Sequence, residues 1–211
     1  MKKYLLLDHD GVLVDTEPWY FRAGQRALAD LGLSLDRDDY LHDMSRGLGT
    51  WARARAAGVG EPTITRQREL RDTYYQEYLR TEAIEIDGVV DALAELARHV
   101  RMAVVTTAKR VDFDLIHEQR RIVPFMDFVL VREDYQQAKP HPEPYLTALE
   151  RFGADRHEAL VVEDSARGLA SAVAAGIDCA VVHNDFTRGQ DFSLATWRSD
   201  SLRQLTGMVA P

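Results

Sequence analysis

The sequence predicts an α/β protein in which a doubly wound parallel sheet is interrupted by an all-helical insert. Short apolar runs alternate with helical patterns over most of the chain, which is typical of strands joined by crossover helices. No convincing strand occurs between Val14 and Glu85. A length of 211 residues also fits one domain plus a smaller insert. We therefore expect residues 1–14 and 86–211 to form the core and residues 15–85 to form a helical domain.

Each expected strand is a short apolar run bounded by polar or turn-forming residues. The first covers residues 5–7, three leucines that lead directly into the segment Asp8-His9-Asp10-Gly11. Four more strands are expected at residues 102–105, 128–131, 159–162 and 179–182. Helices between successive strands favour parallel pairing, because a parallel connection has to cross one face of the sheet.

The insert is expected to consist of four helices. Residues 19–31 repeat apolar side chains on one helical face, Pro18 suits a first helical position, and Gly32 ends the pattern. Three more helices are expected at residues 36–44, 50–57 and 63–80. Glycines and one proline separate these segments, and both residue types interrupt helices.

Four helices are expected between the strands of the core. They cover residues 89–100, 111–122, 142–152 and 165–175. After Asn184 the pattern is mixed and predicts only a short helix near residues 201–205. The five strands and four helices of the core would give a sheet covered on both faces.

Composition excludes several classes of function. A net charge of −8 and a pI near 5.4 disfavour binding to nucleic acid or to an anionic membrane surface. Cys179 is the only cysteine, which excludes disulfides and cysteine-based zinc sites. The sequence has neither a signal-peptide h-region nor an apolar stretch long enough to span a bilayer. We expect a cytoplasmic enzyme that acts on a small molecule as a monomer or a homodimer.

Polar residues follow the expected strands at the ends that face the ligand crevice in an open α/β sheet. The set comprises Asp8, Asp10, Thr106, Lys139, Glu163 and Asp164. Magnesium binds one or two carboxylates and leaves room for a substrate phosphate. A lysine supplies a point charge for that phosphate, and an aspartate can itself attack phosphorus. The pattern therefore favours phosphoryl-transfer chemistry with Mg²⁺.

These segments resemble, in order, the four motifs of the haloacid dehalogenase-like (HAD) hydrolase superfamily. The matching residues are the run from Asp8 to Asp15, Thr106, Lys139-Pro140 and Glu163-Asp164-Ser165. The helical insert that follows the first motif is similar to the C1-type cap domain of subfamily I. The resemblance spans the chain and implies a Rossmann-like core with hydrolase activity that depends on Mg²⁺.

The resemblance also implies a role for each acidic residue. Asp8 would be the nucleophile and a magnesium ligand. Asp10 would protonate the leaving oxygen and then activate water, and its backbone carbonyl would bind magnesium. Asp164 would complete the metal site, with Glu163 as a direct or water-mediated ligand.

Four residues would bind the transferring phosphoryl group in a protein of this family. Thr106 and Lys139 would hold its oxygens, and Lys139 would also offset the repulsion between nucleophile and substrate. The backbone N–H groups of His9 and Thr107 would add donors. Phosphoryl transfer depends mainly on alignment and charge neutralisation, which agrees with this set.

Sequence differences narrow the reaction within the superfamily. Dehalogenases lack the second aspartate of the first motif, whereas Asp10 is present here. Phosphonoacetaldehyde hydrolases use a lysine of the cap, and no lysine occurs between Lys3 and Lys109. A non-catalytic binding module is disfavoured because every motif residue is intact. Phosphate-monoester hydrolysis is the expected activity.

A β-phosphoglucomutase-like phosphomutase is the alternative. Those enzymes share Thr16 and an arginine similar to Arg46, but they carry a histidine where Tyr20 stands and also a cap lysine. Thr16, Glu17, Tyr20 and the loop Ser45-Arg46-Gly47 are expected to contact the substrate, and Arg46 could bind a carboxylate or a second phosphate. Sugar phosphates, phosphoglycolate, nucleotides and cofactor phosphates all stay open as substrates.

Overall fold

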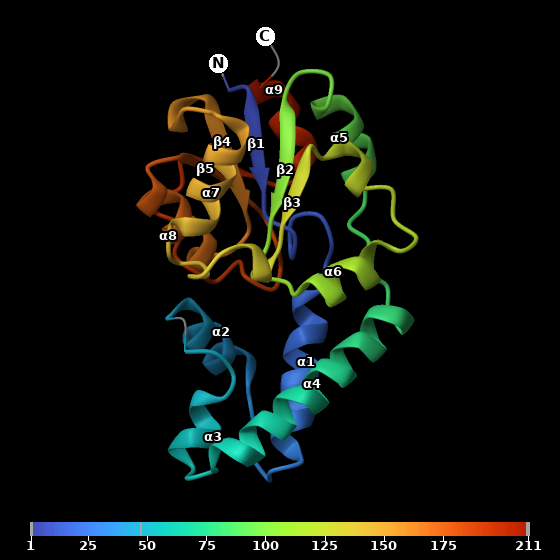
Figure 1. Ribbon diagram of the computed structural model, residues 1–211, viewed down its shortest axis with the longest axis vertical. Helices are drawn as coiled ribbons and strands as arrows, with labels where there is room; N and C mark the ends of the chain where they lie inside the picture. The colour runs from blue at the N-terminus through green and yellow to red at the C-terminus, as the bar shows by residue number, and fades with distance from the viewer. Residues whose placement is uncertain (1, 47, 210–211) are drawn as a thin grey trace. The chain divides into compact units, whose positions relative to one another are not determined.

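The computed structural model describes residues 2–46 and 48–209 (Figure 1). The chain divides into two compact units. One unit combines Met1–Asp15 with Glu85–Pro211, and the other is Thr16–Ile84. The chain therefore leaves the first unit after a single strand and returns to it about seventy residues later.

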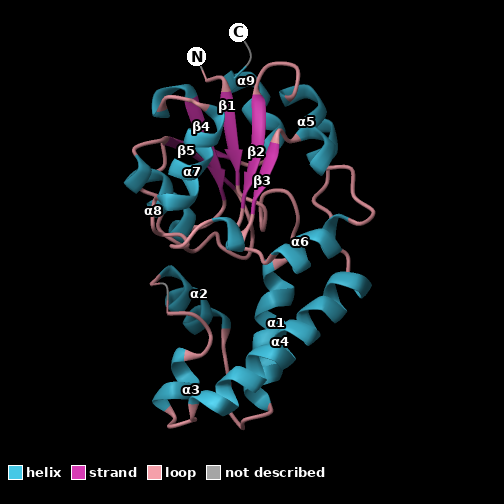
Figure 2. Ribbon diagram, in the orientation of Figure 1, coloured by secondary structure: helices cyan, strands magenta, loops and turns pink. Residues whose placement is uncertain are grey.

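The first unit contains a six-stranded parallel sheet (Figure 2). Its strands are β1 (Tyr4–Leu7), β2 (Arg101–Val105), β3 (Phe128–Leu130), β4 (Ala159–Glu163), β5 (Asp178–Val182) and β6 (Trp197–Ser199). The spatial order is β3-β2-β1-β4-β5-β6, and all neighbouring strands are parallel. This arrangement confirms the predicted doubly wound α/β class.

The central strand β1 is apolar because both of its faces are covered. Leu5, Leu6 and Leu7 are fully buried. β1 pairs with β2 on one side and with β4 on the other, with Leu6 opposite Ala103 and Val161. The carboxyl ends of the three strands therefore lie next to one another, and the residues that follow them can share one site.

Helices cover the sheet of the first unit. They are α5 (Val89–Leu96), α6 (Arg110–His117), α7 (Glu143–Phe152), α8 (Ala166–Ala175) and α9 (Thr206–Val209). Short 3₁₀ helices occur at η1 (Val123–Phe125), η2 (Arg132–Asp134), η3 (Arg156–Glu158) and η4 (Leu202–Leu205). Tyr145 and Ala148 of α7 and Leu169 of α8 pack against Leu6 and Val161 in one apolar cluster.

The second unit contains α1 (Glu17–Ala29), α2 (Arg37–Ser45), α3 (Ala52–Ala56) and α4 (Glu61–Thr81). Within the described residues 16–46 and 48–84, none belongs to a strand. Helices α1 and α4 contact each other, and both bury apolar residues, including Ala23, Ala27 and Ile64. Arg26 stacks on the ring of Tyr74, with 3.7 Å between the guanidinium carbon and the ring centroid.

The structure differs from the sequence prediction at a few elements. Strand β6 was not expected, because its three residues occupy the sheet edge and show no apolar run. Helix α6 ends at His117 instead of residue 122, since the Arg120 side chain donates to the Ile116 carbonyl and Pro124 follows. The helix expected near residues 201–205 is 3₁₀ and leads into α9. No described helix is long and apolar enough to cross a membrane.

Candidate active site

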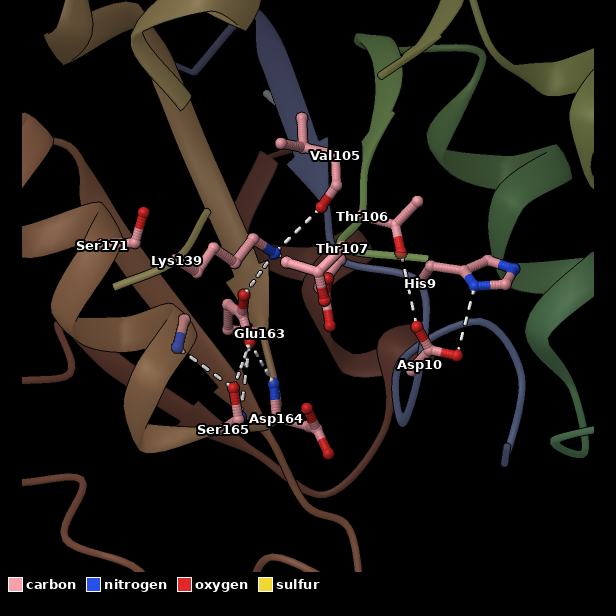
Figure 3. A network of polar contacts seen from close by, with 12 residues as sticks. His9, Asp10, Val105, Thr106, Thr107, Lys139, Glu163, Asp164, Ser165 and Ser171 are labelled. Atoms are coloured by element: carbon pink, nitrogen blue, oxygen red, sulfur yellow. Dashed lines mark hydrogen bonds and ion pairs between the residues drawn. The ribbon is translucent and has the colours of Figure 1, made fainter. Parts of the chain in front are cut away.

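The functional residues of the first unit gather at the carboxyl ends of its central strands (Figure 3). Asp8 follows β1 and Thr106 follows β2. Glu163 is the last residue of β4 and is followed by Asp164. Lys139 comes from the loop that precedes α7. The structure thus brings four sequence-predicted segments to one edge of the sheet.

Lys139 connects two of the carboxylates. Its Nζ donates to Asp8 Oδ1 at 2.6 Å, to Glu163 Oε1 at 2.7 Å and to the Val105 carbonyl at 2.9 Å. Its side chain is buried. Burial disfavours the charged amine, but Asp8 and Glu163 outweigh that effect and raise the pKa of Lys139. The group is therefore a fixed ammonium with all three N–H bonds directed.

Glu163 uses both of its oxygens within the protein. Oε1 accepts from Lys139 and from the Tyr145 hydroxyl, each at 2.7 Å, and Oε2 accepts from the Ser165 hydroxyl at 3.0 Å. Burial opposes ionisation of Glu163, yet the Lys139 charge and these hydrogen bonds lower its pKa. A Cβ at Gly168 of α8 would lie 1.8 Å from Glu163 Cδ, so only glycine leaves room for this carboxylate.

The surroundings of Asp8 disfavour its ionised form. Burial, followed by the neighbouring Glu163 charge, raises the pKa of Asp8 to about 7, although Lys139 acts in the opposite direction. Asp8, Glu163 and Asp164 each offer a carboxylate oxygen, and these oxygens lie within 4.8 Å of one another. One ammonium does not balance this negative charge.

A divalent cation would fit this cluster. Hard oxygen donors suit Mg²⁺, and the raised pKa of Asp8 shows that the cluster disfavours its own charge. Asp164 Oδ2 accepts from the Thr187 hydroxyl at 3.2 Å. Gly11, at φ +81°, lies against the same carboxylate. A Cβ at this position would lie 2.0 Å from Asp164 Oδ2, so the close approach requires glycine.

Asp10 lies apart from that acidic trio. Its Oδ2 accepts from the Thr106 hydroxyl at 3.3 Å, and its Oδ1 lies 3.4 Å from His9 Nδ1. The Thr106 hydroxyl itself accepts from the Ala108 N–H at 3.0 Å, so its proton is available to Asp10. The Tyr135 hydroxyl donates to the Thr106 carbonyl at 2.7 Å and fixes this strand end.

The two residues expected to act through backbone N–H groups also have engaged side chains. His9 is fully buried, and its Nε2 lies 2.9 Å from His117 Nε2. Thr107 Oγ1 accepts from Arg167 Nη2 at 3.3 Å. The sequence indicates only a backbone role for His9 and gives no sign of its buried contact with His117.

The predicted substrate residues Thr16, Glu17 and Tyr20 lie in the second unit. Thr16 is buried at the start of α1, where its carbonyl accepts from the N–H of Tyr20. Glu17 accepts from the Tyr40 hydroxyl, and the Tyr20 hydroxyl accepts from Arg71. Glu17 and Tyr20 therefore each have a polar partner within the helical unit.

The loop after α2 is exposed to solvent at Arg46. Arg46 is exposed, and its Nη1 lies 3.3 Å from His42 Nε2. Gly47, which belongs to the same predicted substrate loop, lies outside the described residues.

Sequence reasoning missed several residues that hold the site together. Tyr145, Tyr135 and Thr187 bond Glu163, Thr106 and Asp164 as described above. Tyr145 lies on the buried face of α7, and a buried tyrosine hydroxyl needs a polar partner. That rule could have singled out Tyr145 but not identified its partner.

The fold and these strand-end groups define a Rossmann-like α/β protein with an acidic, lysine-containing site suited to phosphate and a divalent cation. A family model described as haloacid dehalogenase-like hydrolase matches residues 5–182. Protein CbbY of Rhodobacter capsulatus is 31% identical over 99% of this chain and 97% of its own length. The chain therefore belongs to the haloacid dehalogenase-like hydrolase family.

The name of one further relative states an activity, and the structure of another contains a bound ligand. The phosphorylated carbohydrates phosphatase of Thermotoga maritima is 29% identical over 85% of this chain and 85% of its own length. The structure of a CbbY variant from Rhodobacter sphaeroides in complex with xylulose-(1,5)bisphosphate has a TM-score of 0.83 and 25% identity. It covers 97% of this chain and 96% of that one.

Proposed function

We propose that this protein is a Mg²⁺-dependent phosphatase that hydrolyses a small phosphorylated metabolite through an aspartyl-phosphate at Asp8. Membership of the family, together with a relative named as a phosphatase, makes it a phosphoric-monoester hydrolase. The observation that carries the mechanism is the buried contact of 2.6 Å between Lys139 Nζ and Asp8 Oδ1 beside two further carboxylates.

Asp8 is the nucleophile in this proposal. Lys139 occupies its Oδ1, so Oδ2 is the oxygen that attacks phosphorus. The bond from phosphorus to the leaving oxygen breaks, and Asp10 gives that oxygen a proton. Asp10 then takes a proton from water, whose oxygen attacks phosphorus and releases inorganic phosphate and the Asp8 carboxylate.

The remaining polar groups hold the phosphoryl oxygens. The Lys139 ammonium, whose N–H bonds are directed at Asp8, Glu163 and the Val105 carbonyl, attracts them by its charge. The Thr106 hydroxyl, once it turns from Asp10, and the N–H groups of His9 and Thr107 donate to them. Mg²⁺, held by Asp8, Asp164 and the Asp10 carbonyl, with Glu163 as a direct or water-mediated ligand, would neutralise phosphoryl charge. Because both oxygens of Glu163 are already bonded, its main contribution is to position Lys139.

The helical unit, Thr16–Ile84, is assigned the part of a cap that selects the substrate. Thr16, Glu17, Tyr20 and Arg46 are its proposed contacts. A CbbY variant was crystallised with xylulose-(1,5)bisphosphate, and the exposed Arg46 guanidinium could bind a second phosphate. Sugar phosphates and sugar bisphosphates are therefore the first compounds to test.

A substrate screen tests this function. Phosphate release is measured from sugar phosphates, sugar bisphosphates, phosphoglycolate, nucleotides and cofactor phosphates, with Mg²⁺ or with EDTA. We expect release that requires Mg²⁺. Conversion of β-glucose-1-phosphate to glucose-6-phosphate without phosphate release would instead establish the phosphomutase alternative.

One substitution tests the nucleophile. Asp8→Asn should abolish turnover while the protein stays folded, because an amide oxygen is a poor nucleophile. Asp114→Asn is the matched control, since Asp114 is an exposed residue of α6. Near-normal turnover of Asp8→Asn, measured as phosphate release, would refute the mechanism.

A further inference from the structure

The segment that follows β5, residues 183–190, contacts the acidic cluster. Phe186 and Thr187 of this segment are buried, whereas the charged residues on either side, Asp185 and Arg188, are exposed. The Thr187 hydroxyl donates to Asp164 Oδ2 at 3.2 Å. A mostly polar segment therefore turns one hydroxyl inward, onto a carboxylate that the proposed function assigns to Mg²⁺.

Hydrogen bonds within the segment fix the backbone around Thr187. The Thr187 N–H donates to the Asn184 carbonyl at 3.2 Å, and the Gln190 N–H donates to the Thr187 carbonyl at 2.9 Å. The Phe186 N–H donates to Asn184 Oδ1 at 2.7 Å. The backbone that carries the hydroxyl is therefore held in place without help from a cation.

The same segment is bonded to the first and to the fourth motif. Asn184 Nδ2 donates to the Gly11 carbonyl at 3.3 Å, and Gln190 Oε1 accepts from the Ala166 N–H at 2.7 Å. Gly11 belongs to the first motif, and Ala166 begins α8 directly after the fourth. Thr187 therefore lies on a bridge between the two segments that supply the proposed metal ligands.

The bond from Thr187 restricts how the Asp164 carboxylate can turn. The terminal torsion of an aspartate side chain has a broad energy minimum, so the carboxylate rotates easily unless a partner holds it. Thr187 and Asp164 are both buried, and the hydroxyl bonds Oδ2 of this carboxylate. Outer partners of this kind orient the ligands of a metal ion and strengthen its binding.

We propose that Thr187 is a positioning residue of the Mg²⁺ site, whose hydroxyl fixes the orientation of the Asp164 carboxylate for the cation. This inference rests on the proposed function, which assigns Asp164 to Mg²⁺. Thr187 acts through Asp164, so loss of its hydroxyl weakens metal binding, and a higher concentration of Mg²⁺ compensates for that loss.

Calorimetric titration of the substrate-free protein with Mg²⁺ tests the inference. Thr187→Val replaces the hydroxyl by a methyl group of similar size and should raise the Kd for Mg²⁺ about tenfold, as expected for a lost outer partner of a metal ligand. Thr187→Ser keeps the hydroxyl and should retain most of the affinity. Thr50→Val is the matched control, since Thr50 is a buried threonine of the helical unit, and it should bind Mg²⁺ as the wild type does.

Thermal unfolding gives a second readout and shows whether each variant folds. At the same concentration, Mg²⁺ should raise the melting temperature of the wild type and of Thr187→Ser more than that of Thr187→Val, because the stabilisation depends on the ratio of Mg²⁺ concentration to Kd. If Thr187→Val does not fold, Thr187→Ala gives the same comparison, since it removes the hydroxyl and puts no group in its place.

The rate of phosphate release should show the same dependence. Thr187→Val should need about tenfold more Mg²⁺ for half of its maximal rate, while its kcat at saturating Mg²⁺ stays close to that of the wild type. Equal Mg²⁺ affinity of Thr187→Val and the wild type would overturn the inference and leave the proposed function intact. An equal loss of affinity in Thr187→Ser and Thr187→Val would overturn it too, because the hydroxyl would not be the group that matters. A wild-type protein that binds no Mg²⁺ would refute the metal assignment of the proposed function itself.

Discussion

The single residue Lys139 reduces the repulsion between two buried carboxylates. The chain buries Asp8 and Glu163 next to each other, and the two carboxylates would repel each other strongly without a cation between them. Lys139 donates to both and is itself buried. An arginine would carry the same charge, but its planar guanidinium lacks the compact shape that fits here.

Removal of this ammonium should damage both activity and stability. We expect Lys139→Ala to lower kcat by several orders of magnitude, because charge neutralisation of the phosphoryl group is lost. Breaking a buried ion pair also costs about 3–5 kcal/mol of folding free energy. Phosphate release and thermal unfolding would measure the two effects, with the exposed Lys109→Ala as control. An Lys139→Ala enzyme that unfolds like the wild type would show that the pair is not structurally important.

The sequence alone could predict the residues at strand ends but not their individual contacts. Asp8, Thr106, Glu163 and Asp164 follow apolar strands, and parallel strands bring such residues to one edge. The Tyr145 contact with Glu163 depends on the exact packing of α7, which no sequence pattern encodes. The same holds for His117, whose partner is distant in sequence.

Helix α8 combines local capping with close packing against Glu163. Ser165 caps its first turn by accepting from the Gly168 N–H at 3.1 Å. Gly168 lets the helix approach Glu163 closely, and small residues such as Ala172 and Ala175 bring it near the sheet. The helix therefore helps to set where the Glu163 carboxylate, and through it Lys139, is held.

A single added methyl group should disrupt this arrangement. Gly168→Ala would place a Cβ 1.8 Å from Glu163 Cδ, so the carboxylate or the helix must move. Although alanine favours helix formation, we expect a lower melting temperature and a lower kcat, because Lys139 loses its positioned partner. Gly189→Ala is the matched control, since its Cβ meets nothing within 4 Å. Unfolding scans and phosphate release check both, and a Gly168→Ala protein as stable as the control would contradict the packing argument.

Elements buried on both sides were the easiest to predict. The five strands from β1 to β5 are apolar because helices cover both faces of the sheet, so their sequences are distinctive. Strand β6 lies at the edge and combines a half-buried Trp197 with an exposed Arg198. Such a short and polar edge strand depends on pairing with β5, which is a tertiary effect.

At the scale of the whole molecule, the chain places an acidic site in the unit that contains the sheet and inserts a helical unit directly after the first motif. The raised pKa of Asp8 is expected to make the stability of the protein depend on pH. Asp8 and His117 change the stability in opposite directions as the pH rises, so a comparison of variants is needed to separate their contributions.

The sign for each group follows from its pKa in the folded and unfolded states. The pKa of Asp8 is raised from 3.8 to about 7, so over this interval the folded protein holds a proton that the unfolded chain releases. Asp8 therefore makes the protein less stable as the pH rises from about 4 to about 7. The pKa of His117 is lowered from 6.5 to about 3, so over this interval the unfolded chain holds a proton that the folded protein lacks. His117 therefore makes the protein more stable as the pH rises through this interval.

A comparison of the wild-type protein with Asp8→Asn isolates the Asp8 contribution, because both proteins contain the same histidines. Without Mg²⁺, Asp8→Asn should melt higher than the wild type at pH 7 and similarly near pH 4. Each kcal/mol corresponds to about 2–4 °C in a chain of this length. Saturating Mg²⁺ should raise the melting temperature of the wild type and close the gap, since a cation that binds only the folded protein stabilises it. Scanning calorimetry at several pH values checks this, and parallel melting curves of the two proteins over the whole range would show that Asp8 is not held in a costly environment.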